Sequence, residues 1–417
     1  MTLTLVAKNA GWLGLIYGLN YAVPILTVPV VARALGPNIY GILATFYAYA
    51  IYTGVLTGYG FTITGPRAIA GLDDDDVQNL SKTVSTIISA QILLGIVAVM
   101  VSFTALPLIP YGYEYRLVGF VVLIQTFSSS MLPQWVFIGL QRTRNLAVIQ
   151  LVIQALATVV VLLVIRTQND LLLLVTVRCI AAILVLILSF AELSRYNIHW
   201  CCPTISDLIT AIRRASHLFV SALSINLYTS TAVLIIAFVL GPIAAGAFAL
   251  ANRVRVAMAG VIGPITQAIY PFLCRIAVRE ESNEEAWARR LFFRIIIVIS
   301  GLISLTLFAF APLIIWLAGG RAFQEAALVL RIIAFLPIIV ALSNTLGRQT
   351  MIPLHMDREY TRVVVSAALL GFTGVFILTY KLGLQGAALG MLGVEMYVTL
   401  AFAIIVQRRK SILSLFF

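Results

Sequence analysis

The sequence predicts an all-α integral membrane protein of about twelve transmembrane helices, arranged as two pseudo-symmetric six-helix lobes. Three observations lead to this fold class: the composition, a series of long apolar segments, and a motif repeated half a chain apart. Of the 417 residues, 61% are apolar and only 11% are charged, and the mean hydropathy is +1.03. A soluble domain would be nearer half apolar and about a quarter charged. No aqueous fold could hide so much apolar surface, so the solvent of this chain must be largely lipid.

Apolar runs of about 20 residues or more, the length that crosses a bilayer as a helix, recur along the whole chain. Each run is expected to be helical, because lipid offers the backbone no other hydrogen-bond partner. The expected spans are 11–35, 39–65, 83–107, 117–138, 145–165, 170–192, 217–240, 244–272, 291–318, 325–347, 361–380 and 386–406.

The loops between these spans carry their positive charge very unevenly. Of the 28 Lys and Arg residues, 19 fall on one side, 5 on the other, and 4 inside spans. Because cytoplasmic loops are enriched in Lys and Arg, both termini are expected in the cytoplasm. The net charge of +12 is therefore a topology signal. No nucleic-acid partner is expected, since the basic residues are scattered over many short loops.

The longest loops lie on the expected cytoplasmic side. Residues 193–216 are expected to link a first lobe, 1–192, to a second lobe, 217–417. Within this linker, Thr204-x-x-Asp207 is typical of a capping box before a short amphipathic interfacial helix. The acidic run Asp73–Asp76 is expected to be a solvated loop that caps the third span.

An internal repeat supports two lobes of like orientation. Leu35-Gly36-Pro37-Asn38-Ile39-Tyr40-Gly41 follows the first span, and Leu240-Gly241-Pro242-Ile243-Ala244-Ala245-Gly246 follows the seventh. The offset, 240 − 35 = 205 residues, is nearly half of the chain. Six helices per copy give both halves the same orientation, which predicts a pseudo-two-fold axis along the membrane normal and a substrate path between the halves.

Five charged residues lie about seven to ten residues inside the expected spans, which is roughly 10–15 Å at 1.5 Å per residue. They are Arg178, Arg253, Arg255, Arg331 and Glu395. Each costs about 2.5–3.5 kcal/mol to bury at the centre of a span, so a functional role is the default expectation. Four cations suit an anionic cargo, and the arginine fork suits phosphate. Glu395 is expected either to take part in coupling or to form a structural bridge with Arg253 or Arg255.

Polar and aromatic side chains on the first, second and seventh spans are candidates to line the path, since aromatic faces bind sugar rings. The substrate-contact candidates are Asn20, Tyr21, Tyr49, Tyr52, Asn226 and Tyr228. Pro24 and Pro29 each remove a backbone hydrogen bond from the first span, which predicts a kinked helix beside a cavity and a candidate hinge.

Residues 20–70 resemble the start of bacterial polysaccharide repeat-unit flippases of the Wzx type. The shared features are the Pro24/Pro29 pair, the Ala32-Arg33-x-Leu35-Gly36-Pro37-x-x-Tyr40-Gly41 turn, and the segment from Tyr59-Gly60-Phe61 to Arg67. Beyond these residues, the chain agrees with the family only in length, span number and repeat, which are common to the multidrug/oligosaccharidyl-lipid/polysaccharide exporter superfamily.

The resemblance implies a V-shaped, two-lobed transporter of the bacterial cytoplasmic membrane. Its cargo would be an undecaprenyl-pyrophosphate-linked oligosaccharide, moved from the cytoplasmic to the periplasmic leaflet by alternating access. Membrane lipids, and a polysaccharide polymerase with other export proteins, are the implied partners.

Other functions remain open at this point. A multidrug-type cation antiporter would favour buried carboxylates, and the spans hold one against four arginines. A lipid II flippase would share the cationic path. A membrane enzyme acting on lipid-linked sugars would usually carry a large extramembrane loop or an acidic catalytic cluster. No catalytic residue, cofactor or metal site is expected, because the chain has no Walker loop and its three His residues lack partners at metal spacing.

Overall fold

The computed structural model describes residues 3–72, 76–196, 198–260, 262–263, 266, 283–352, 354 and 356–408, with side chains except at 3–22, 24, 283–286 and 288. Within these ranges every regular element is a helix, so the predicted all-α membrane fold is confirmed. The contacts of the chain divide it into two compact units. Unit 1 comprises Met1–Val23 and Ile42–Leu223, and unit 2 comprises Pro24–Gly41 and Ser224–Phe417.

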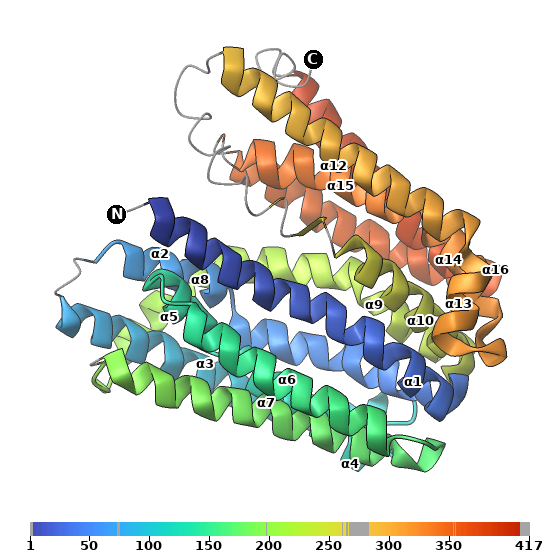
Figure 1. Ribbon diagram of the computed structural model, residues 1–417, viewed down its shortest axis with the longest axis horizontal. Coiled ribbons are helices and arrows are strands. Elements are labelled where there is room, and N and C mark those ends of the chain that lie inside the picture. Colours follow the sequence, from blue (N-terminus) through green and yellow to red (C-terminus); the bar gives the residue numbers. More distant parts are fainter. Residues whose placement is uncertain are drawn as a thin grey trace. The chain divides into compact units, whose positions relative to one another are not determined.

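Unit 1 holds both ends of the first helix and the helices that follow it. Helix α4 packs on α7, α6 also packs on α7, and α2 packs on α5 (Figure 1). The elements are α1 (Leu3–Gly58, outside Pro24–Gly41), α2 (Phe61–Ala70), α3 (Val77–Ala105), η1 (Leu106–Leu108), α4 (Arg116–Ser130), α5 (Gln134–Gly139), α6 (Arg144–Val164), η2 (Gln168–Asp170), α7 (Leu171–Leu193), η3 (Ser194–Tyr196) and the first part of α8 (Ile205–Thr229).

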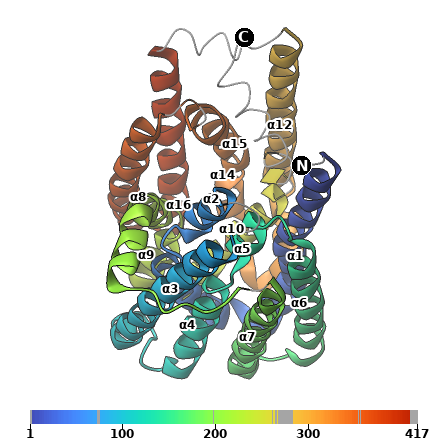
Figure 2. The ribbon, with the colours of Figure 1, turned by 90° about the vertical axis from the view of Figure 1, so that its left-hand side faces the viewer.

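Unit 2 is built around the long helix α16, against which α9, α14 and α15 pack, while α10 packs on α9 and α14 (Figure 2). The segment Pro24–Gly41 of α1 belongs to this unit. The other elements are α9 (Thr231–Leu240), α10 (Pro242–Ala259), α12 (Asn283–Ala309), α13 (Ala311–Gly319), η4 (Arg321–Phe323), α14 (Glu325–Ile333), α15 (Leu336–Leu346), the π-helix η5 (Gly347–Met351) and α16 (Asp357–Arg408).

Nine helical stretches of the described ranges are long and apolar enough to cross a membrane. One of them, Ile25–Ala70, includes the end of the expected span 11–35 and all of 39–65, and another, Asp357–Arg408, includes 361–380 and 386–406. The paired spans are separated by breaks at Gly36 of α1 and Gly383 of α16. The expected span 244–272 begins as α10 and continues outside the described residues. Large apolar side chains such as Met100 and Leu369 are well exposed, which suits a lipid environment.

Both copies of the Leu-Gly-Pro motif adopt the same backbone conformation. Gly36 has φ 67° and ψ 172°, and Gly241 has φ 89° and ψ −178°. This region of the backbone map is open essentially to glycine alone. The glycine reverses the chain and the following proline begins the next helix, where its missing N–H costs nothing. Gly320 and Gly383 make the same kind of turn later in unit 2.

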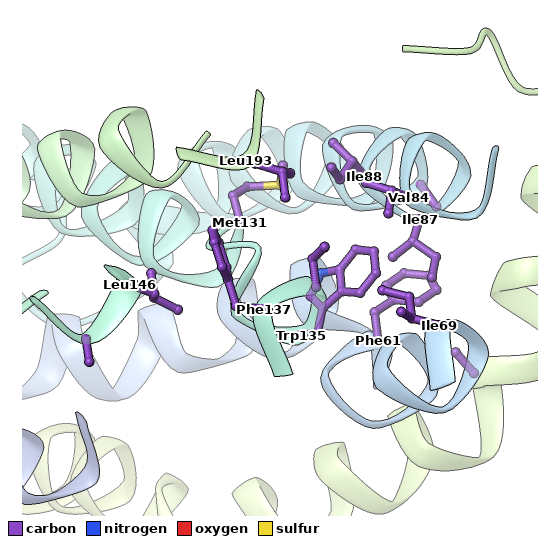
Figure 3. Packing of buried hydrophobic residues seen from close by; sticks show 14 residues of the cluster. Phe61, Ile69, Val84, Ile87, Ile88, Met131, Trp135, Phe137, Leu146 and Leu193 are labelled. Carbon is purple, nitrogen blue, oxygen red and sulfur yellow. The ribbon is translucent and has the colours of Figure 1, made fainter. Parts of the chain in front are cut away.

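Aromatic residues fill the core of unit 1. Trp135 and Phe61 lie with Ile69 of α2 and Ile87 of α3 in one buried cluster (Figure 3). The Trp135 indole donates to Oε1 of buried Gln91 at 3.2 Å, so the polar edge of this ring is satisfied inside the core. The cluster therefore holds the start of α3 and the short helices α2 and α5 in fixed positions.

Both predicted cap motifs that the structure describes are confirmed. The Thr204 hydroxyl accepts from the backbone N–H of Asp207 at 3.2 Å, and the Asp207 carboxylate accepts from the backbone N–H of Thr204 at 3.3 Å. Asp76 accepts from the backbone N–H of Asn79 at 3.1 Å and caps α3. These bonds from Asn79, its side-chain amide first, lower the pKa of Asp76. The rest of the run, Asp73–Asp75, lies outside the described residues.

Candidate transport site

The two repeat turns lie directly against each other inside unit 2. A Cβ placed on Gly41 would overlap the carbonyl oxygen of Pro242 and lie 2.8 Å from the backbone nitrogen of Gly246. A Cβ on Gly246 would overlap the carbonyl oxygen of Pro37 and lie 3.1 Å from the backbone nitrogen of Gly41. This reciprocal pattern is what a local two-fold axis between the copies produces. The backbones can approach this closely only because both positions are glycine.

Arg33 ties the first repeat turn to the end of α13. Its Nη2 donates to the carbonyl oxygens of Trp316 at 3.1 Å and Leu317 at 2.8 Å. These are among the last carbonyls of α13, where the negative end of the helix dipole lies, and that of Trp316 also accepts from the backbone N–H of Gly320 at 2.9 Å. Arg33 thereby acts as a C-terminal cap from a segment nearly 300 residues away in the chain. In the sequence Arg33 stood out only as part of the Ala32-Arg33-x-Leu35-Gly36-Pro37 motif, which does not indicate this partner.

Helix α10 carries the two predicted arginines beyond the repeat turn. Arg255 lies nine residues after Gly246, which is roughly 14 Å along the helix. Its side chain is half-buried, and its Nε and Nη2 both donate to Oδ1 of Asn252, at 3.0 and 2.8 Å. Asn252, one turn earlier, fixes the direction of the guanidinium. The i, i+3 spacing of an amide and an arginine could have revealed this partner in advance.

Glu395 is the predicted carboxylate of the last span, and it is buried on α16. Arg255 and Glu395 attract each other electrostatically, yet no ion pair within 4 Å joins them and no hydrogen bond reaches the carboxylate from any described residue. The helices that carry Arg255, Arg331 and Glu395, namely α10, α14 and α16, pack on one another. Unit 2 thus holds a cation and an anion that attract each other without forming an ion pair within 4 Å.

One predicted residue and two that sequence reasoning missed border this pair. The predicted Tyr228 and the unpredicted Tyr360 both interact electrostatically with Glu395, and the exposed Arg348 of the π-helix, also unpredicted, interacts with both tyrosines. Tyr228 is only 8% exposed and belongs to a core cluster with Met351 and Phe402. Tyr228, Tyr360 and Arg348 come from three separate segments, so no local spacing could indicate the group.

The remaining predicted arginines differ in exposure. Arg253 is exposed whereas Arg255 is half-buried, as expected for positions about 200° apart on a helix. Arg331 is exposed on α14, and Arg178 is half-buried on α7 of unit 1. Neither Arg331 nor Arg178 makes a hydrogen bond or ion pair with any side chain in the described ranges. Asn226 is half-buried on α8 and accepts from the Ser230 hydroxyl at 3.3 Å.

In unit 1 the predicted aromatic residues of the second span take part in a polar network. Tyr49 donates from its hydroxyl to the carbonyl oxygen of Ser102 at 2.9 Å, and Thr53 is hydrogen-bonded to the Ser102 hydroxyl at 2.7 Å. Tyr47 donates to Oε1 of Gln125 at 2.9 Å. These bonds join α1 to α3 and α4, so the Tyr49 hydroxyl already has a partner. Tyr52 is half-buried nearby.

Some predicted residues cannot be placed by their side chains. Asn20 and Tyr21 lie on α1, and their side chains, like that of Pro24, are outside the described part. Pro29 is half-buried within α1. Among the described residues no group of three or more His, Cys, Asp or Glu side chains could hold a metal ion.

Comparison with solved structures defines the class of fold. The chain resembles an inward-facing multidrug resistance transporter of the MATE family with a TM-score of 0.69, at 15% identity over 95% of both chains. It resembles the lipid II flippase MurJ in an inward closed conformation with a TM-score of 0.71, at 13% identity over 100% of this chain and 90% of the other. The fold is therefore that of this group of polytopic helical membrane transporters.

Sequence comparison then gives the family. The family described as "Polysaccharide biosynthesis protein" matches residues 6–277, well over half of the chain, and the chain belongs to it. A candidate O-antigen transporter of Escherichia coli (strain K12) is 26% identical over 404 residues, covering 97% of both chains. Another from Shigella dysenteriae is 23% identical over 398 residues, covering 94% of this chain and 98% of the relative. The resemblance to polysaccharide flippases of the Wzx type is thus confirmed, and the chain is a multi-pass membrane transporter.

Proposed function

We propose that this chain flips an undecaprenyl-pyrophosphate-linked oligosaccharide repeat unit from the cytoplasmic to the periplasmic leaflet by alternating access. The observation that carries the proposal is Arg255, a half-buried guanidinium on α10 that Asn252 orients and that no ion pair within 4 Å neutralises among the described residues. Family membership supports a polysaccharide precursor as cargo. A diphosphate supplies the anionic partner that such an arginine lacks. The low dielectric constant around a half-buried side chain strengthens the attraction between the guanidinium and the phosphate.

The other predicted residues have different roles in this proposal, as first contacts for the cargo, as sugar contacts or as structural support of the path. Arg253 and Arg331, both exposed, would meet the cargo first, and Arg178 would supply a cation from unit 1. Tyr52, Asn226, Asn20 and Tyr21 are proposed sugar contacts. Tyr49 and Tyr228 are proposed to support the path, because the hydroxyl of Tyr49 is already bonded and Tyr228 is packed in a core.

Glu395 is proposed as the coupling group. A buried carboxylate without a hydrogen-bond partner among the described residues can change its charge when the field of Arg255 changes. Cargo phosphate on Arg255 would weaken that field, so binding of cargo and loss of the charge on Glu395 would favour each other. This gives the site a route to release its cargo as well as to hold it.

Pro24 is the proposed hinge, with Pro29 as a second flexible point. The chain passes from unit 1 to unit 2 between Val23 and Pro24, within the part of α1 that precedes the break at Gly36. A proline removes one helical hydrogen bond and kinks the helix, so bending there disrupts little else. We place the protein in the bacterial cytoplasmic membrane with both termini cytoplasmic, and a polysaccharide polymerase is the proposed downstream partner.

A second candidate function is export of organic cations, which the likeness to MATE-family structures favours at the level of the fold. Such cargo requires buried anionic groups, whereas Glu395 is the one carboxylate deep in a described span and arginines outnumber it. A lipid II flippase would share the cationic α10 and differ from the proposal in the sugar attached to the pyrophosphate.

Deletion of the gene from its host separates these candidates. Loss of surface polysaccharide with accumulation of lipid-linked repeat units in the cytoplasmic leaflet is the expected result, reversed by the intact chain. Unchanged polysaccharide together with increased sensitivity to lipophilic cations would instead identify a cation exporter. Arrest of cell-wall synthesis would identify a lipid II flippase.

A further inference from the structure

Two hydrogen bonds fix the position of the linker before α8 along helix α3. The backbone N–H groups of His199 and Cys201 donate to the hydroxyls of Ser81 at 3.0 Å and Ser85 at 3.1 Å. These serines lie one turn apart where α3 enters its apolar stretch. Trp200, between the two donors, is therefore held near the boundary between water and hydrocarbon. It is 58% exposed, and this boundary is where tryptophan is enriched in membrane proteins.

The start of α8 presents two different faces. Leu208, Ala211, Ile212 and Ala215 pack on the core cluster formed with α2, α3 and α5. Asp207 also faces α3, where its carboxylate lies 3.3 Å from Nζ of Lys82. These contacts fix which face of the helix is left outside.

That outer face combines apolar and basic side chains. Ile205 and Ile209 are 76% and 60% exposed, although both are large and apolar. Arg213 follows at the next i+4 position of the same face, Arg214 lies beside it, and both are exposed. We call Trp200, Ile205, Ile209, Arg213 and Arg214 the linker face. An apolar stripe flanked by arginine is the pattern of a helix in the membrane interface.

The number of residues in this stretch places the face outside the hydrocarbon layer. The helical stretch Ile205–Leu240 has 36 residues, whereas about 20 suffice to cross a hydrocarbon core. About 16 residues therefore exceed one span. The polar end of the stretch is the one that carries Asp207, Arg213 and Arg214. The linker face thus borders the headgroups.

We propose that the linker face binds anionic phospholipid headgroups of the leaflet it borders. Trp200, Ile205 and Ile209 enter the boundary between acyl chains and headgroups, and Arg213 and Arg214 contact the lipid phosphates. This lipid site lies in unit 1, whereas the proposed cargo residue Arg255 lies in unit 2. The lipid site anchors the segment through which the chain continues from unit 1 into unit 2 at Leu223 and Ser224.

Trp200 emission measures this contact directly in the full-length protein. The chain has five tryptophans, so the Trp200 component is the difference between the unaltered protein and Trp200→Phe. Both proteins are placed in phosphatidylcholine nanodiscs that contain increasing fractions of phosphatidylglycerol brominated near the top of its acyl chains. Brominated phosphatidylcholine serves as the zwitterionic probe.

Preferential quenching of Trp200 by the phosphatidylglycerol probe is the expected result. Arg213→Gln and Arg214→Gln should each raise the fraction needed for half-quenching about fivefold, since one basic residue near an anionic surface is worth about 1 kcal/mol. Ile205→Ser with Ile209→Ser should reduce quenching by both probes. Arg358→Gln with Arg362→Gln removes the same charge from exposed positions of α16 and should leave the Trp200 curve unchanged.

Three results would overturn the proposal. Equal quenching by the two probes would mean that headgroup charge is not recognised. Unchanged curves in both the Arg213→Gln and the Arg214→Gln variants would exclude these arginines as lipid ligands. Protection of Trp200 from both brominated lipid and aqueous acrylamide would mean that a second copy or another protein covers the linker face. None of these results bears on cargo transport, which is measured separately.

Discussion

At the scale of single residues, the proposed recognition of cargo depends on how the side chain of Arg255 is positioned. Two hydrogen bonds to Asn252 orient its guanidinium, and Glu395 attracts it without contact within 4 Å. Arg255 is thus positioned by one neighbour and left with donors for a ligand. A direct buried bridge would instead have satisfied the arginine and cost several kcal/mol to break.

We therefore predict that Arg255→Ala lowers cargo export to about a tenth or less, because a hydrogen bond to a charged group contributes about 1.5–3 kcal/mol. Arg255→Lys should recover part of the export, since it keeps the charge and loses the fork. Asn252→Ala should give an intermediate loss through misdirection of the guanidinium. Surface polysaccharide measured at equal protein abundance tests all three, and normal export by Arg255→Ala would contradict the role.

A double-mutant cycle between Arg255 and Glu395 tests whether these two residues form a direct ion pair. The predicted coupling energy in thermal unfolding is about 1 kcal/mol or less, far below the 3–5 kcal/mol expected when a direct buried pair is broken. A coupling of several kcal/mol, with abundance lost in each single variant and restored in the double variant, would show a structural bridge instead.

At the scale of elements, the contact between the two repeat turns is the tightest helix approach described. Gly41→Ala should destabilise the protein by about 1–3 kcal/mol, because its Cβ would overlap the carbonyl oxygen of Pro242. Gly374→Ala is the matched control within α16, since a Cβ there meets nothing within 4 Å. The control should be stabilised by about 0.5–1 kcal/mol through helix propensity. Equal unfolding midpoints for both variants would contradict the close approach.

The cap that Arg33 places on α13 gives another element-scale prediction. Arg33→Ala should lower stability by about 1 kcal/mol, since two carbonyls of α13 lose a charged donor. Arg321→Ala serves as the control, because Arg321 is exposed next to the same turn and its side chain makes no hydrogen bond to any described residue. Thermal unfolding in detergent compares the two, and an equal loss would remove the capping role.

The helices and their contacts show which features could be predicted from the sequence alone. Long apolar runs and repeated Gly-Pro motifs predicted the helices and the positions of the turns, because span length and turn-forming residues are local properties. The cap by Arg33 and the grouping of Tyr228 with Tyr360 could not be predicted, since each joins segments more than 100 residues apart. The buried charges identified the α10 region, and Asn252 could have been added from its spacing to Arg255.

At the scale of the whole molecule, we propose that this chain is a transporter whose helix α10 recognises a lipid-linked diphosphate. Family membership, the contact between the repeated turns and the orientation of Arg255 by Asn252 all support that claim. Transport in a purified system tests it without help from other cellular proteins. The sugar on the cargo and the ion that drives transport can be varied in the same system.

The most direct test is translocation of an undecaprenyl-pyrophosphate-linked oligosaccharide across proteoliposomes that contain only this protein. Cargo supplied in one leaflet is detected by an enzyme that modifies its sugars from the other side. We predict translocation by the unaltered protein and a fall to about a tenth or less with Arg255→Ala at equal incorporation, consistent with the loss of one charged hydrogen bond. Translocation that is absent from the unaltered protein, or undiminished in Arg255→Ala, would contradict the proposal.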